Sequence, residues 1–94
     1  MPLDHFSDRN AVIAAIEEFD QLGRKKFHKK YGFGPATKYQ LRYEGKFYDS
    51  KAVLGVAHGI QFPQEGPLRS SDFHGGRPTT SKLKDLGFEI EVIS

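Results

Sequence analysis

The sequence predicts an α+β domain, in which a small antiparallel sheet of about three strands packs with three to five short helices. Two patterns support this fold class. Apolar and polar side chains alternate around a Glu-Gly pair in residues 39–48 and again in residues 88–92, as in half-buried strands. Other segments carry apolar side chains at the spacing of amphipathic helices. A chain of 94 residues forms one domain, so we expect a single module over residues 1–94.

The first predicted helix follows a short lead-in, residues 1–7. Ser7 or Asp8 can cap it by accepting a hydrogen bond from a backbone N–H two or three residues later. Its apolar side chains recur at helical spacing: Val12, Ile13, Ile16, Phe19 and Leu22. The acidic side chains within residues 17–20 lie on the other face, which we expect to point away from any nucleic acid. Gly23 ends this helix or is tolerated within a longer one.

A short basic helix is predicted at residues 24–31, RKKFHKKY. Phe27 and Tyr31 are four residues apart, so they share one helical face and anchor the segment to the core. The cations then project outward. Two glycines and a proline in residues 32–35 close the segment.

The middle of the chain combines a β-hairpin with a buried helix. Glu44 and Gly45 form the turn, in which glycine supplies the positive φ that such turns require. Asp49 or Ser50 caps the following helix, whose side chains are apolar almost all round, so we expect it to be the most buried element. Gly59 stands where a left-handed C-terminal cap is expected.

The last third of the chain is predicted to hold a loop, two helical segments and a strand. Residues 70–72 form a capped turn that ends at the glycine pair 75–76, where we expect backbone freedom. Thr79 or Thr80 caps the last helix. The final strand, residues 88–92, pairs with the hairpin.

Charge is unevenly distributed, although the formal net charge is only +2. Residues 1–23 hold one Arg and five acids, a balance of −4. Residues 24–51 hold nine Lys or Arg and two acids, a balance of +7, and residues 52–94 hold four bases and five acids, a balance of −1. A basic block within a folded domain indicates a basic face, which attracts polyanions. A solvated lysine-rich helix is the alternative explanation.

We recognise no catalytic, metal or cofactor motif, so we predict a binding module without a cofactor. The sequence has no cysteine, and its four histidines lack metal-binding spacing, so we expect isolated histidines on the surface or at helix ends. GxSxG, P-loop and GxGxxG motifs are absent from it. Asp49 and Lys51 have the D-x-K spacing of a nuclease metal site, which needs a further acid nearby. We prefer to interpret Asp49 as a helix cap, and Lys51 as sharing an anion such as a DNA phosphate with the helix N-terminus.

Nothing in the sequence indicates a membrane protein. Residues 1–10 lack the regions of a secretory signal, and no apolar stretch approaches the roughly 20 residues of a membrane helix. We therefore expect a cytoplasmic domain.

Binding of double-stranded DNA is the function that the residues favour. Lys and Arg supply phosphate contacts, and base readout needs side chains such as Arg or His that reach the grooves. The predicted interface combines the basic helix, the corner at residues 48–51 and the segment around the glycine pair. Its members are Arg24, Lys25, Lys26, His28, Lys29, Lys30, Lys38, Tyr48, Ser50, Lys51, Arg69, Ser71, His74, Gly75, Gly76 and Arg77.

Four stretches together resemble a known family. They are LGRKKFHKKYGFG, YxLxxxGKFYDSKAVLGVAHG, PLRSSDFHGG and TxxxLxxLGFEI, over about residues 10–92. Their order and spacing resemble the N-terminal domain of McrA-like HNH endonucleases, the type IV restriction enzymes that cut modified DNA. The recurrent positions of this pattern are occupied by Tyr48, Asp49, Lys51, Phe73, Gly75 and Gly76.

The resemblance implies a domain that reads or positions DNA for an HNH nuclease outside this chain. The implied partners are double-stranded DNA, with or without a modified base or backbone, and the other domains of a parent endonuclease. Phe73 is interpreted as a core residue rather than a base-stacking wedge. Two alternatives remain: a protein-interaction module that docks an acidic partner domain, and a small metal-dependent nuclease at Asp49 and Lys51.

Overall fold

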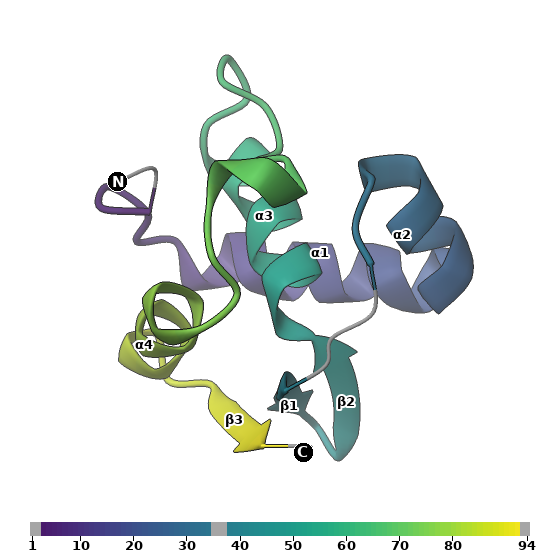
Figure 1. Ribbon diagram of the computed structural model, residues 1–94, viewed down its shortest axis with the longest axis vertical. Coiled ribbons are helices and arrows are strands. Elements are labelled where there is room, and N and C mark those ends of the chain that lie inside the picture. Colours follow the sequence, from purple (N-terminus) through teal and green to yellow (C-terminus); the bar gives the residue numbers. More distant parts are fainter. Residues whose placement is uncertain (1–2, 35–37, 93–94) are drawn as a thin grey trace.

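The computed structural model describes residues 3–34 and 38–92 and confirms the predicted α+β class (Figure 1). In chain order its elements are α1 (Arg9–Leu22), α2 (Arg24–Tyr31), β1 (Tyr39–Tyr43), β2 (Lys46–Asp49), α3 (Ser50–Gln61), the 3-10 turn η1 (Ser70–Asp72), α4 (Arg77–Asp85) and β3 (Glu89–Val92). The three strands form one antiparallel sheet in the order β2-β1-β3. None of the helices in this part of the chain is long and apolar enough to span a bilayer.

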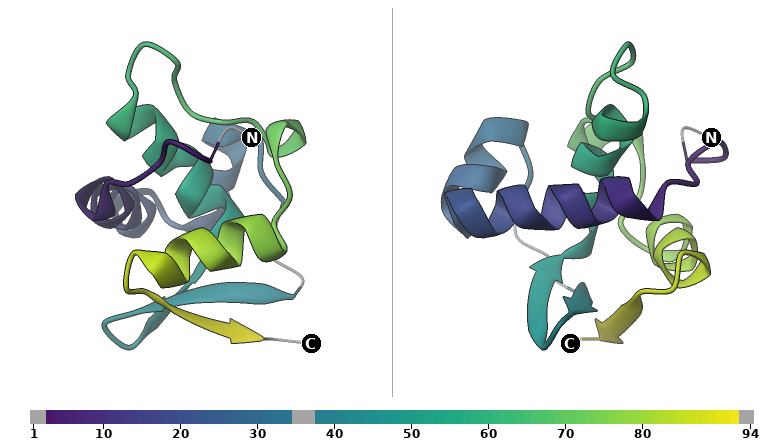
Figure 2. Two further views of the ribbon diagram at one scale, coloured as in Figure 1. Left: turned by 90° about the vertical axis from the view of Figure 1, so that its left-hand side faces the viewer. Right: turned by 180° about the vertical axis from the view of Figure 1, so that it is seen from behind.

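Helix α3 is the centre of the fold. It leaves the end of β2 and crosses α1, with which it makes its most extensive packing (Figure 1). The strands form a layer at one end of the molecule, and α2 lies on the opposite side of α1 from them (Figure 2). Every residue of α3 from Ala52 to His58 is buried, which confirms that this helix is the most buried element.

The predicted hairpin is present with the predicted turn. Glu44 and Gly45 both have positive φ, 49° and 78°, and this backbone twist matches that of the two strands. Leu41 of β1 lies opposite Tyr48 of β2 and Ile90 of β3, so these three side chains point to the same face of the sheet. Leu41 and Tyr48 are buried and Ile90 packs against the core, which places the helices on this face.

Residues 3–8 are held more firmly than was expected of the predicted lead-in. Leu3 and Phe6 are buried in the core. The backbone N–H groups of Ser7 and Asp8 both donate to Gln61 Oε1 at 3.0 Å, which joins the start of α1 to the end of α3. Asp8 is the N-cap, as predicted, and its carboxylate accepts a hydrogen bond from the backbone N–H of Asn10 at 2.9 Å.

Two predicted helix ends are wrong, and a tertiary contact explains each. Helix α3 continues past Gly59 to Gln61, and the glycine instead allows the loop to cross the helix closely; a Cβ on Gly59 would lie 2.5 Å from Pro67 N. Helix α4 begins at Arg77, so Thr79 and Thr80 lie within it and do not cap it. The buried Thr79 hydroxyl instead donates to the carbonyl of His74 at 2.7 Å.

The substitution Gly59→Ala should lower the free energy of unfolding by about 2 kcal/mol, because the added methyl group meets backbone and cannot be relieved by a rotamer change. Urea denaturation followed by circular dichroism measures this. Gly34→Ala is the matched control, since a Cβ at Gly34 has no neighbour within 4 Å among the described residues. Equal stabilities of the two variants would show that the loop does not press on α3.

Candidate nucleic-acid interface

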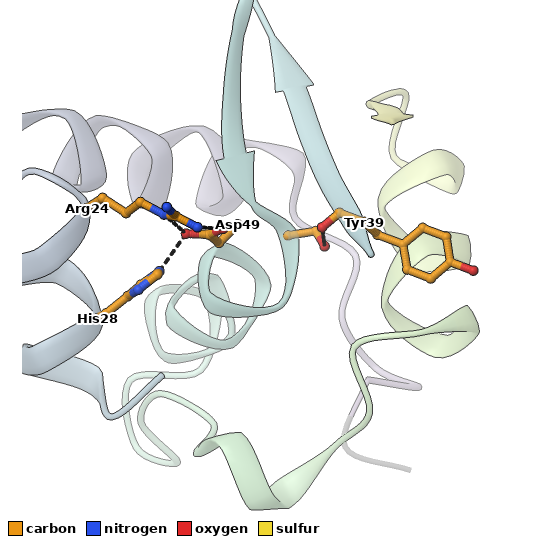
Figure 3. A network of polar contacts seen from close by, with 5 residues as sticks. Arg24, His28, Tyr39 and Asp49 are labelled. Atoms are coloured by element: carbon orange, nitrogen blue, oxygen red, sulfur yellow. Dashed lines mark hydrogen bonds and ion pairs between the residues drawn. The ribbon is translucent and has the colours of Figure 1, made fainter. Parts of the chain in front are cut away.

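The junction between β2 and α3 contains a buried carboxylate that binds two side chains of α2 (Figure 3). Asp49 is only 2% exposed. Arg24 donates to it through two nitrogens, with Nε 2.8 Å from Oδ2 and Nη2 3.1 Å from Oδ1. His28 Nε2 lies 2.6 Å from Oδ2. That contact has the distance of an ion pair but lacks the direction of a straight hydrogen bond.

This arrangement corrects the predicted role of Asp49. It occupies the N-cap position of α3, but its side chain makes no capping hydrogen bond and turns towards α2 instead. The two hydrogen bonds and the negative charge of Asp49 raise the pKa of Arg24. A buried carboxylate needs such partners, because removing its charge from water is costly.

Tyr48 and Ser50 flank this carboxylate, and the structure removes both from the predicted DNA-contacting surface. The Tyr48 side chain is buried, and its hydroxyl donates to Asp20 of α1, 2.9 Å from Oδ1 and 3.0 Å from Oδ2. Ser50 is equally buried, and its hydroxyl donates to the carbonyl of Tyr39 at 3.2 Å. Both residues hold the junction in place.

Lys51, in the first turn of α3, binds protein rather than an open anion site. Its Nζ donates to the Ser70 carbonyl at 2.6 Å and lies 3.3 Å from Ser70 Oγ. The same nitrogen sits over the ring of Phe73, 5.2 Å from the centroid. Gly75 packs along the Lys51 stem, since a Cβ there would lie 3.1 Å from Lys51 Cδ.

The glycine pair was expected to provide backbone freedom. Neither glycine has positive φ, but Gly76, with φ −81° and ψ −130°, lies outside the helical and extended regions. Close packing against Lys51 is the reason for glycine at position 75, while Gly76 is the N-cap residue of α4. Phe73 is buried, which confirms its interpretation as a core residue.

The cations of α2 form two groups: some are paired with a carboxylate of another element, and the others are exposed without such a pair among the described residues. Lys30 pairs with Glu18 of α1 at 3.0 Å, and Tyr31 donates a hydrogen bond to the same carboxylate. By contrast, the side chains of Lys25, Lys26 and Lys29 are exposed, and no ion pair or hydrogen bond to them occurs within residues 3–34 and 38–92. Phe27 is buried beneath them, so the predicted anchoring by aromatic side chains is confirmed.

The acidic face of α1 therefore does not simply point into solvent. Glu18 binds α2, and Asp20 binds Tyr48 of β2. The acids of α1 thus help to hold the basic helix and the hairpin against the core.

The other predicted interface residues lie on the segment that leads into α4 and at the start of β1. The edge-to-face contact of Phe33 with Phe73, 6.3 Å between centroids, places this segment beside the end of α2. Lys38 is exposed next to the Tyr39 ring, at 5.4 Å. The predicted interface residues Arg69, Ser71, His74 and Arg77 are exposed. Asp72 is exposed among them, and its Oδ2 lies 3.8 Å from Arg69 Nε, so this arginine already has an acidic partner.

The geometry does not support a metal site at the D-x-K motif. Within the described residues, no three His, Cys, Asp or Glu side chains are placed to hold a metal ion together. Asp49 faces Arg24 and His28, and Lys51 points to Ser70. His28 and His58 lie in the last turns of α2 and α3, at helix ends as expected, but neither is on the surface. His28 is largely buried, and His58 is buried with its Nδ1 3.0 Å from the Gly66 carbonyl.

The ion-pair cluster was missed in the sequence, although one signal for it was available. Arg24 and His28 are four residues apart, so they share a helical face, and Phe27 beside them fixes which face of α2 meets the core. No local pattern pointed from that face to Asp49.

The fold and this surface together define a small α+β domain in which a helix with exposed lysines is bound to a buried helix–strand junction. The chain belongs to the ScoMcrA-like N-terminal head domain family, whose model matches residues 7–92. This confirms the resemblance to the N-terminal domain of McrA-like endonucleases. None of the curated proteins compared with the chain is similar to it.

A solved structure of a restriction endonuclease is similar to almost the whole chain. It is described as the structure of the type IV phosphorothioation-dependent restriction endonuclease ScoMcrA. The sequences are 30% identical, the TM-score is 0.68, and the match covers 93% of this chain but only 13% of that one. The similarity is therefore to the head domain of a restriction endonuclease and not to its nuclease domain.

Replacing the buried carboxylate by an amide, Asp49→Asn, should lower the free energy of unfolding by about 2 kcal/mol, because Arg24 and His28 lose their anion. The loss is smaller than for a fully buried ion pair, because half of the Arg24 side chain still reaches water. Glu89→Gln is the control, since its ion pair with Arg42 is exposed at 3.7 Å and should contribute under about 0.5 kcal/mol. Urea denaturation compares them. Similar losses in both variants would contradict a special role for Asp49.

The hydroxyl of Tyr48 should make stability depend on alkaline pH. Burial, followed by the hydrogen bond to Asp20 and its charge, raises the pKa of Tyr48 from 10.0 to about 12. The folded chain therefore holds this proton more tightly than the unfolded chain, so the contribution is complete below about pH 10 and is lost as the pH rises to about 12. Tyr48→Phe should be about 1 kcal/mol less stable at neutral pH and should lack this component of the alkaline loss. Urea denaturation at several pH values, with Tyr43→Phe as control, measures both effects.

Proposed function

We propose that this chain binds double-stranded DNA as the head domain of a modification-dependent restriction endonuclease, whose catalysis belongs to another domain. The single observation that carries the proposal is the trio of free lysines on α2, Lys25, Lys26 and Lys29. Exposed ammonium groups without a protein partner are available to phosphates, and their binding releases the counterions of DNA. Such a domain works with cytoplasmic DNA and with the other domains of its parent.

The family and the fold support a DNA partner over a generic polyanion. The family is the head domain of a ScoMcrA-like endonuclease, and the similar solved structure is that of a type IV phosphorothioation-dependent restriction endonuclease. Phosphorothioation is a change to the DNA backbone, where the lysines of α2 would bind.

We propose positioning of DNA, rather than recognition of a base, as the main role. Arg24 and His28, which belong to the residue types suited to base readout, are bound to Asp49 and face the junction. His74 and Arg77 remain exposed beside α4. With few side chains free to reach base edges, contacts to phosphates dominate, and these position a protein without carrying sequence information.

Replacing the three free lysines by alanine should weaken duplex binding by a similar factor on every sequence and should lower the dependence of log K on log salt by about 3, close to 1 for each phosphate contact. Titration of a labelled duplex at several salt concentrations measures both quantities. The matched control replaces three lysines outside the predicted interface by alanine: Lys46, Lys82 and Lys84. An unchanged salt dependence in the α2 variant would place the DNA elsewhere.

The unmodified chain provides the decisive result. If the unmodified chain shows no measurable duplex binding even at about 50 mM salt, the proposal is overturned, because phosphate contacts are strongest at low salt. Retention of an acidic protein domain by the same lysines, without retention of DNA, would favour the protein-interaction module.

A further inference from the structure

We propose that Asp49 and Lys51 are positioning residues that hold two basic segments at a fixed spacing, and that this spacing favours duplex over single-stranded DNA. The two segments are α2 and residues 69–77. The preference for duplex rests on the proposed DNA binding, whereas the fixed spacing does not. The D-x-K motif would then act as a double clamp instead of a metal site.

The first clamp holds α2. The Asp49 carboxylate binds Arg24 and His28, which lie one helical turn apart on the face of α2 that is turned towards the junction (Figure 3). Lys25, Lys26 and Lys29 lie on the remaining surface of the same helix. Fixing the inner face of α2 therefore also fixes the direction in which its free lysines point.

The second clamp holds residues 69–77. Lys51 reaches the Ser70 carbonyl at 2.6 Å and covers the Phe73 ring, so it grips this segment at two points. Gly75 allows the segment to approach the Lys51 stem. The exposed side chains of Arg69, His74 and Arg77 project from a segment that Lys51 ties to α3.

The two clamps share one rigid base. Asp49 ends β2 and Lys51 lies in the first turn of α3, with the buried Ser50 between them. Ser50 is bound to the Tyr39 carbonyl of β1, which anchors the junction to the sheet. One short stretch of chain thus sets the position of two segments that are far apart in sequence.

A fixed spacing matters more for a duplex than for a single strand. The phosphates of a duplex occupy set positions, so two basic segments can bind together only at a matching separation. A single strand is flexible and can follow basic groups at many separations. Loosening a clamp should therefore weaken duplex binding selectively, which direct loss of a phosphate contact would not do.

The test uses Lys51→Met, which keeps the aliphatic stem but removes the donor to Ser70. Because the chain has no cysteine, two introduced cysteines, Lys26→Cys and Ser71→Cys, can carry spin labels for a distance measurement by double electron–electron resonance. Without the labels, binding is measured for a labelled duplex and for one of its strands. Lys46→Met on the hairpin is the matched control.

We expect one narrow distance distribution in the parent chain and in Lys46→Met, and a broad one in Lys51→Met. Duplex affinity should fall at least tenfold in Lys51→Met, while single-strand affinity should change less than twofold. An unchanged distance distribution would overturn the clamp. Equal losses on duplex and single strand would overturn the positioning role and identify Lys51 as a phosphate ligand.

A second variant covers the case in which Lys51→Met does not fold. In Gly75→Ala, the new methyl group lies 3.1 Å from Lys51 Cδ, so the Lys51 stem or the segment must move by a few tenths of an ångström while all charges remain. The distance distribution should again broaden, with a smaller selective loss for duplex; a narrow distribution in this variant would overturn the clamp. Absence of duplex binding by the parent chain would end the DNA proposal and the duplex preference, while the distance measurement would still decide the clamp.

Discussion

The burial of the Asp49 carboxylate is the constraint on which the rest of the surface depends. A carboxylate that is 2% exposed must be paired, and here α2 supplies Arg24 and His28. That requirement draws a strongly basic helix onto the junction of β2 and α3, although five positive residues on eight positions repel one another. Phe27 and Tyr31 add apolar contacts, and Glu18 binds Lys30. The basic surface thus follows from a buried anion that fixes where its helix lies.

Local pattern was sufficient to predict most of the elements from the sequence. The spacing of Val12, Ile16 and Phe19, the Glu44-Gly45 turn and the alternation in β3 each depend on neighbours within a few residues. The errors arose where distant chain segments decide. Gly59 lies within α3 and makes room for the crossing Pro67 instead of ending the helix, and the Thr79 hydroxyl is bound by the His74 carbonyl. Propensity indicates that a glycine can end a helix, but only packing shows that it does not.

The candidate site was predictable in composition but not in detail. The charge block correctly indicated a basic helix with cations on its surface, since nine bases against two acids cannot all be paired within residues 24–51. Which cations stay free depends on partners 12 to 25 residues away, such as Glu18 for Lys30 and Asp49 for Arg24. Tyr48 and Ser50 are excluded from the predicted DNA-contacting surface because they are buried, and their burial likewise depends on distant parts of the chain. A sequence gives the number of charges directly, but their pairing requires the fold.

The D-x-K motif shows how similar spacing can serve opposite electrostatic needs. A metal-dependent nuclease requires carboxylates that gather negative charge around a cation. At this junction the charge of Asp49 is already balanced by a guanidinium and an imidazole, and the ammonium of Lys51 is bound by a carbonyl. Five of the six positions predicted to recur in the family pattern take part in this packing: Tyr48, Asp49, Lys51, Phe73 and Gly75. At the sixth, Gly76, a Cβ would meet no atom within 4 Å among the described residues. The five build the scaffold, and the free lysines of α2 stand apart from it. The surface cations can therefore change, and with them the contacts to a partner, without disturbing the junction that positions them.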